Sequence, residues 1–377
     1  MKLRQLLILA CTFFLWVLIV DDTCAQSKYS KYKGKAAKGK SIGKYKGIRN
    51  AGKFHAHQYM GIMVNAFNYY GDMAPVNRAA STDISFTRPG LGFTFGHRFH
   101  PGASLRANFN WGWIKAEDFS SGTTDREQDP SAYGRYMRNL SFRNHIKEFN
   151  VGFNMYFLPQ TGSVAFRLPL NGYIFVGAGV YHHAPKGLVS DVDAQTGELV
   201  DGSLVGTWVD LRKLGTEGQQ LDPGTKDEIE ARSGTRPADP YPLINFQIPV
   251  ALGVTMKLPA NFDLRFEMGY RFAFTDYLDD VSDQYVSLSH FGDNDLARMM
   301  SDRSAELQDE TIRKVALDFN GSSYTVSGDI RDNAGDFNGK RGNPENNDVY
   351  FITQFKLVYL IPESSRVGKR QRAAKFR

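Results

Sequence analysis

The stretch ASLRANFNWGW, residues 103–113, decides the fold because two kinds of side chain alternate along its whole length. The odd positions are all apolar and end in Trp111 and Trp113, whereas the even positions hold serine, arginine, asparagine or glycine. Successive side chains of a β-strand point to opposite faces of the sheet. The stretch therefore predicts a strand with one apolar face and one polar face.

Seven other segments repeat this alternation with varying regularity. They are residues 59–67, 91–96, 148–157, 173–180, 244–258, 262–275 and 349–359. Soluble sandwiches and lipocalin-like barrels also contain alternating strands, so the pattern alone leaves those folds open.

Three details favour a membrane barrel over these soluble folds. The apolar face of residues 244–258 is unbroken, which matches the roughly 9–11 residues of a strand that crosses hydrocarbon. The opposite faces carry arginine and glutamate beside glycine, as a polar lumen does. Aromatic residues such as Trp111, Tyr270 and Tyr359 lie near strand ends, where interface girdles form. We therefore expect an all-β fold, an eight-stranded antiparallel transmembrane β-barrel over residues 57–361.

The N-terminal segment indicates export. Basic residues within the first four positions precede an apolar run and then small residues, which is typical of a secretory signal peptide over residues 1–25. Both cysteines, Cys11 and Cys24, lie in this segment. We therefore expect no disulfide and no thiolate metal site in the mature chain.

Connection lengths predict how the barrel is oriented. Tight turns occupy residues 100–102 and 259–261, and a moderate connection spans 159–171. The long connections are residues 71–88, 115–140, 184–242 and 276–346. Outer-membrane barrels keep short turns in the periplasm, so we expect both termini there, long loops outside the cell, and outer-membrane lipid around the barrel. The polar long loops suit exposed, partly ordered segments, with one short helix within residues 295–307.

The formal net charge of +6 is concentrated in two tails that flank the barrel. The first is an arm over residues 26–56, and the second is a tail over residues 362–377. Such basic segments should be flexible, either as solvated tethers or as docking segments for an acidic periplasmic partner or phosphate-bearing lipid. Export argues against nucleic acid as a partner. The lysines of the candidate docking arm are Lys28, Lys31, Lys33, Lys35, Lys38, Lys40, Lys44 and Lys46.

Charged residues also occupy the polar faces of the strands. They are Arg106, Glu148, Asp263, Arg265, Glu267 and Arg271. An eight-stranded barrel has a lumen that side chains fill, so we interpret this lumen charge cluster as ion pairs that plug the interior. No nucleophile accompanies a base in this set. We therefore expect no enzymatic activity, no cofactor and no metal.

Four stretches resemble the PorG-type outer-membrane barrel of the type IX secretion system. They are NYYGDMAP (68–75), RPGLGFTFGHRF (88–99), RNLSFR (138–143) and GYRFAFTDYLDDVS (269–282). The resemblance covers about residues 58–361. It implies a membrane component of the secretion apparatus that is tied, on its periplasmic side, to the ring proteins PorK and PorN.

The last of these stretches contains a rim motif, Asp276, Tyr277, Asp279 and Asp280, directly after a strand. Aspartate is a common turn residue, so an ordinary loop turn is one interpretation. The other is that the cluster fixes the loop bundle or binds a cation, with Tyr277 anchored at the membrane interface.

Two functions therefore remain open. One is a non-enzymatic subunit of the secretion machinery that contacts a periplasmic ring. The other is a free-standing outer-membrane barrel whose surface loops serve adhesion, ligand binding or membrane reinforcement.

Overall fold

The computed structural model describes residues 54–73, 87–123, 130–160, 162–191, 202–286, 288–307 and 341–361, all within one compact unit, Ala51–Arg377. The long strands are β1 (His57–Tyr70), β2 (Arg88–His100), β3 (Ala103–Glu117), β4 (Ser141–Tyr156), β5 (Leu170–His182), β8 (Ile244–Lys257), β9 (Phe262–Ala273) and β10 (Val349–Ile361). The short strands are β6 (Pro185–Leu188) and β7 (Trp208–Asp210). The helices are α2 (Asp118–Ser121), α3 (Pro130–Arg138), η3 (Val164–Phe166), α4 (Leu211–Leu214), α5 (Pro223–Ser233), η4 (Leu288–Phe291), α6 (Asp295–Ser301) and η5 (Ser304–Leu307).

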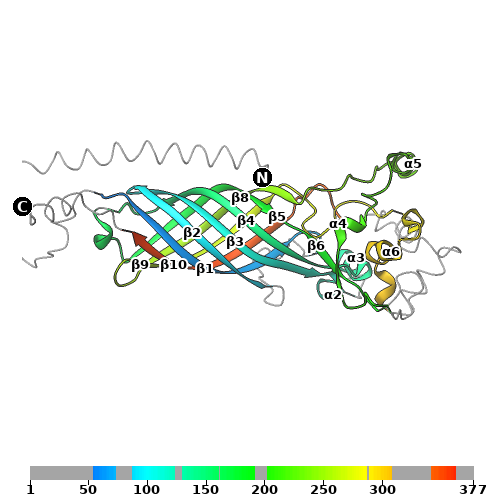
Figure 1. Cartoon of the computed structure of the whole chain (residues 1–377), viewed down its shortest axis with the longest axis horizontal. Helices are drawn as coiled ribbons and strands as arrows, with labels where there is room; N and C mark the ends of the chain where they lie inside the picture. Colours follow the sequence, from blue (N-terminus) through cyan, green and yellow to red (C-terminus); the bar gives the residue numbers. More distant parts are fainter. Residues whose placement is uncertain are drawn as a thin grey trace, which may run out of the picture. The chain divides into compact units, whose positions relative to one another are not determined.

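The eight long strands form a closed antiparallel barrel (Figure 1). Each strand pairs with its neighbour along the chain, β5 pairs with β8, and β1 pairs with β10 to join the first strand to the last. The short strands β6 and β7 extend the sheet from β4. All eight predicted segments are barrel strands, so the predicted fold class is confirmed.

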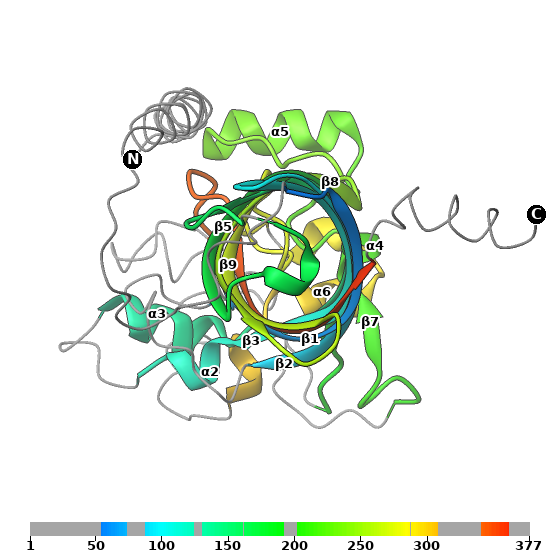
Figure 2. The ribbon, with the colours of Figure 1, turned by 90° about the vertical axis from the view of Figure 1, so that its left-hand side faces the viewer.

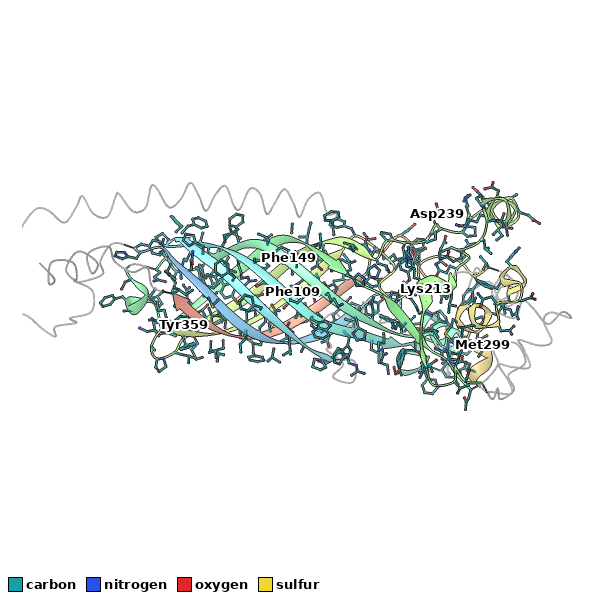
Figure 3. All side chains as sticks on the ribbon, in the orientation of Figure 1. Phe109, Phe149, Lys213, Asp239, Met299 and Tyr359 are labelled. Atoms are coloured by element: carbon teal, nitrogen blue, oxygen red, sulfur yellow. The ribbon has the colours of Figure 1, made fainter. Side chains whose placement is uncertain are left out.

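The two faces of each strand differ as the alternation predicts. Apolar side chains point outward and are exposed, for example Ile62 (64%) and Phe246 (70%). Figure 3 shows Phe109 and Phe149 projecting from the outer wall. Inward side chains are buried and largely polar or aromatic, as Asn108 and Tyr173 are. No helix in the described ranges is long and apolar enough to span a bilayer.

Glycines make room for the large aromatic residues inside the barrel. A Cβ added at Gly112 would lie 2.3 Å from a ring carbon of Phe67, and one at Gly253 would lie 2.3 Å from the ring of Tyr173. Neither distance is sterically possible without movement, since carbon atoms prefer to lie about 3.5–4.0 Å apart. The inward glycines therefore let aromatic rings fill the lumen against a neighbouring strand.

The connections at one end of the barrel, the long-loop end, fold into a loop cap (Figure 1). We use this name for the described residues between β3 and β4, between β5 and β8, and between β9 and β10. Leu211, Leu278 and Met300 share a buried hydrophobic cluster with Phe67 and Tyr350 of the barrel. The described loop residues thus contribute to a shared hydrophobic core, which their polar composition did not lead us to expect. The predicted helix within 295–307 is confirmed as α6, followed by η5.

The opposite, short-turn end is closed by the connection between β4 and β5, which folds back across the barrel (Figure 2). We call residues 157–160 and 162–169 the turn plug. Val164 of η3 is buried against Tyr59, Val358 and Leu360 of the barrel wall. Arg167 donates to the carbonyl oxygen of Phe262 at 2.7 Å and pairs with Asp263. A connection that the sequence predicts only as one of moderate length therefore folds across this end and packs against the barrel wall.

Candidate functional site

The lumen holds a first group of charges around Glu267. The Arg106 guanidinium donates to both carboxylate oxygens of Glu267, at 2.6 and 3.0 Å. Lys356 Nζ lies 2.9 Å from Oε1, and the Tyr173 hydroxyl donates to Oε2 at 2.7 Å. All four side chains are essentially without solvent contact. Two cations and a hydroxyl thus compensate the desolvation of one carboxylate.

A second group surrounds Glu148, further toward the long-loop end. Arg271 Nε lies 3.4 Å from its Oε1, and the Tyr350 hydroxyl donates to Oε2 at 2.5 Å. Amide groups of Gln247 and Asn110 donate to the same carboxylate at 2.9 and 2.5 Å. The side chains of this network come from β3, β4, β8, β9 and β10, so it ties opposite walls of the barrel together. It fills the space that a pore would need.

The predicted lumen charges therefore separate into three places. Arg106 with Glu267 and Arg271 with Glu148 form the two lumen groups, whereas Asp263 and Arg265 lie beside the turn plug. Lys356 completes the first group, and its place on the polar face of its strand was the signal for it. Arg167, the partner of Asp263, lies in a turn without periodicity and gave no such signal.

The rim motif is buried in the loop cap instead of forming an exposed turn. Asp279 is fully buried, and the Tyr69 hydroxyl lies 2.6 Å from its Oδ2 and 2.7 Å from Oδ1 of Asp348. The shared hydroxyl holds two buried carboxyl groups close to each other. Burial, and then the charge of Asp348, raises the pKa of Asp279 well above its usual range.

Asp280 and its neighbours join separate loops of the cap. Asp280 accepts hydrogen bonds from the hydroxyls of Thr216 (2.5 Å) and Tyr241 (2.6 Å). Arg341 donates to the Asp280 carbonyl oxygen and pairs with Glu217 at 3.1 Å. Burial raises the pKa of Asp280 to about 6, although Arg341 opposes this shift. These contacts connect the loop before β8 to the loop before β10.

The other two rim residues also lie within the cap. Asp276 is 7% exposed, and burial followed by the charges of Asp72 and Asp279 raises its pKa to about 9. The Tyr277 ring stacks on Tyr241 with centroids 4.6 Å apart, so its ring packs within the cap. The arrangement supports the interpretation that the motif fixes the loop bundle. Among the described residues, no group of three or more histidine, cysteine or acidic side chains is placed to hold a metal ion.

The candidate docking arm and the basic tail lie outside the described residues, as does the predicted signal peptide. The eight arm lysines between Lys28 and Lys46 therefore have no place in the site geometry given above.

A family model described as "Domain of unknown function (DUF6089)" matches residues 51–197, and no curated protein matches the chain. The chain is similar in fold to Neisserial surface protein A at a TM-score of 0.31 and 7% identity, covering 81% of this chain and 99% of that one. Ail of Yersinia pestis is similar at a TM-score of 0.28 and 7% identity, and the match covers 81% of this chain and 96% of that one. The Ail structure is of a complex with the heparin analogue sucrose octasulfate. A major outer membrane protein of Thermus thermophilus is similar at a TM-score of 0.28 and 10% identity, and the match covers 81% of this chain and 99% of that one.

Proposed function

We propose that this chain is a non-enzymatic outer-membrane barrel subunit of the type IX protein secretion machinery, and that it contacts a periplasmic ring. The observation that carries the proposal is that side chains of the described residues fill the interior of the barrel. The lumen groups around Glu267 and Glu148 fill the interior, the turn plug seals one end, and the loop cap folds over the other. A filled barrel serves as an anchor or docking element better than as a channel.

The outer wall supports placement in a membrane. Large apolar side chains around the barrel, including Leu91 and Phe246, are more than half exposed, whereas soluble monomers rarely expose continuous apolar surfaces of this extent. Hydrocarbon is the natural cover for this wall. Because short turns of outer-membrane barrels face the periplasm, we assign the turn plug and the adjoining ends of β1 and β10 to the side of the proposed ring.

The partners PorK and PorN come from the sequence resemblance, and the basic arm is the segment we assign to them. Replacing its eight lysines (28–46) by glutamine should greatly reduce co-purification of ring proteins, because long-range charge attraction would be lost. Replacing the same eight by arginine keeps the charge and should preserve co-purification. Heat-dependent mobility on gels verifies that each variant is folded.

Equal recovery of ring proteins with the glutamine and arginine variants would contradict this role of the arm. The folded loop cap favours one alternative, a free-standing surface barrel that acts through its loops. In that case replacing the lysines of the arm does not change secretion, and only substitutions in the loop cap alter a surface phenotype such as adhesion.

A further inference from the structure

A small hollow lies at the short-turn end between the turn plug and the barrel wall. Three guanidinium groups line it, those of Arg98, Arg167 and Arg265, together with one carboxylate, Asp263. Arg98 and Arg265 are near enough to repel each other electrostatically. The hollow is therefore cationic, with two positive charges in excess among these four groups.

Asp263 does not satisfy all three cations. Arg167 Nε lies 2.7 Å from Oδ1 of Asp263, and Arg167 also donates to several turn carbonyls. Arg265 reaches the other carboxylate oxygen only at 3.7 Å, beyond hydrogen-bond distance. Arg167 therefore takes up most of this carboxylate and leaves Arg265 weakly paired.

Arg98 and Arg265 are buried but have too few acceptors. They are 7% and 3% exposed, and the Nε of each is buried without a hydrogen-bond partner among the described residues. Arg98 donates to the carbonyl oxygen of Pro101, whereas Arg265 has no hydrogen bond in the described part of the chain. A guanidinium has five N–H donors, and leaving them unpaired in a buried site is costly.

Tyrosine rings cover the faces of both groups. The Arg98 guanidinium lies 3.8 Å from the ring centre of Tyr156, and that of Arg265 lies 4.4 Å from the ring centre of Tyr59. Stacking of this kind stabilises the charge but accepts no N–H bond in the plane of the guanidinium. Both side chains line the hollow, so a ligand placed there would lie beside guanidinium groups that have few acceptors within the described residues.

We propose that this hollow binds a carboxylate group between Arg98 and Arg265. A carboxylate is small, planar and anionic, and it matches the guanidinium edge with two parallel hydrogen bonds. It enters from the short-turn end, as a small solute or as an acidic side chain of a periplasmic protein. The proposal does not depend on the secretion role, since either source uses the same chemistry.

The test uses the full chain in detergent micelles with ¹³C-labelled formate, in sodium chloride at constant ionic strength. Formate that exchanges with a slowly tumbling micelle shows a saturable rise in transverse relaxation. Arg98→Gln and Arg265→Gln should each reduce this rise at least fivefold. Arg236→Gln is the matched control, because Arg236 is a partly exposed arginine that pairs with Asp227 and Glu230 and does not line the hollow.

Heat-dependent gel mobility establishes that each variant is folded. Arg98→Lys provides a milder change, because lysine keeps the positive charge but cannot make the two parallel hydrogen bonds of a guanidinium. Arg98→Lys should weaken formate binding less than Arg98→Gln does. The same relaxation in all variants would overturn the proposal. Phosphate that displaces formate at tenfold lower concentration would overturn the assignment to a carboxylate. Formate displaced by micromolar hexaglutamate identifies a polypeptide as the source, whereas displacement only by millimolar peptide identifies a small solute.

Discussion

Replacing Glu267 by glutamine tests whether ion pairs hold the lumen together. The substitution keeps the size of the side chain but leaves Arg106 and Lys356, both almost fully buried, without their carboxylate. Removing one partner of a buried pair costs about 3–5 kcal/mol. Lys356 can reduce the cost by losing its proton, whereas Arg106 cannot. We therefore expect the lower limit, a loss of about 3 kcal/mol.

This loss is large enough to measure by urea unfolding. For a urea dependence of about 2 kcal/mol per molar, a loss of about 3 kcal/mol lowers the midpoint by about 1.5 M. Tryptophan fluorescence of the protein refolded into lipid vesicles follows the transition. Lys356→Met is the control, because it leaves both hydrogen bonds between Arg106 and Glu267 in place and should shift the midpoint much less.

A midpoint of Glu267→Gln equal to that of the unaltered protein would refute the reasoning. The triple variant Arg106→Met, Glu267→Gln, Lys356→Met gives a second check. It removes both cations together with the carboxylate, so no unpaired charge stays buried, and the Tyr173 hydroxyl can still donate to the oxygen of the new amide. The triple variant should therefore recover most of the stability that Glu267→Gln loses.

Two further predictions concern the ends of the barrel. The pKa of Asp276 is about 9 in the folded protein and about 3.9 in the unfolded chain. The folded state therefore holds this proton more tightly, so the contribution of Asp276 to stability is fully present below pH 4 and is lost as the pH rises to 9. At pH 9 the Asp276→Asn variant should therefore resist protease at the long-loop end better than the unaltered protein does. At pH 4 the two proteins should be cut at the same rate. If both proteins show the same dependence of cleavage on pH, the prediction is wrong. Arg167→Ala removes the contacts that fasten the turn plug, so protease should cut residues 157–169 faster. Planar-bilayer conductance should nevertheless stay absent because the lumen groups remain, and a stable open channel in Arg167→Ala would contradict the filled interior.

The barrel could be predicted from sequence because each strand carries its own signal. The alternation in residues 103–113 depends only on the pleat, and it identifies which side chains face inward without knowledge of any neighbour. Arg106 and Glu267 were both assigned to the lumen on this basis. Their mutual contact could not be predicted, since 161 positions separate them and their meeting depends on the stagger of the closed barrel.

The structures of the loop cap and the turn plug could not be predicted from the alternation of side chains. Leu211 comes from the connection before β8, whereas Leu278 and Met300 come from the connection before β10, and the three meet only in the folded cap. Asp279 and Asp280 look like turn residues, and their burial depends on Tyr69, Thr216 and Arg341, which are distant in sequence. Local periodicity contains no information about such contacts. The rim motif was recognised by its composition, whereas its surroundings required the structure.

Strand β4 is longer than a membrane crossing requires. Its 16 residues at about 3.3 Å each extend about 50 Å, longer than the roughly 30 Å of hydrocarbon in a bilayer. At one end its Arg143 and Asn144 pair with β6 of the cap, and at the other its Tyr156 covers Arg98. One uninterrupted strand thus reaches from the loop cap to the wall of the hollow at the short-turn end. We therefore expect a displacement of β4 at its cap end to be felt at Arg98, which stacks on the last residue of this strand.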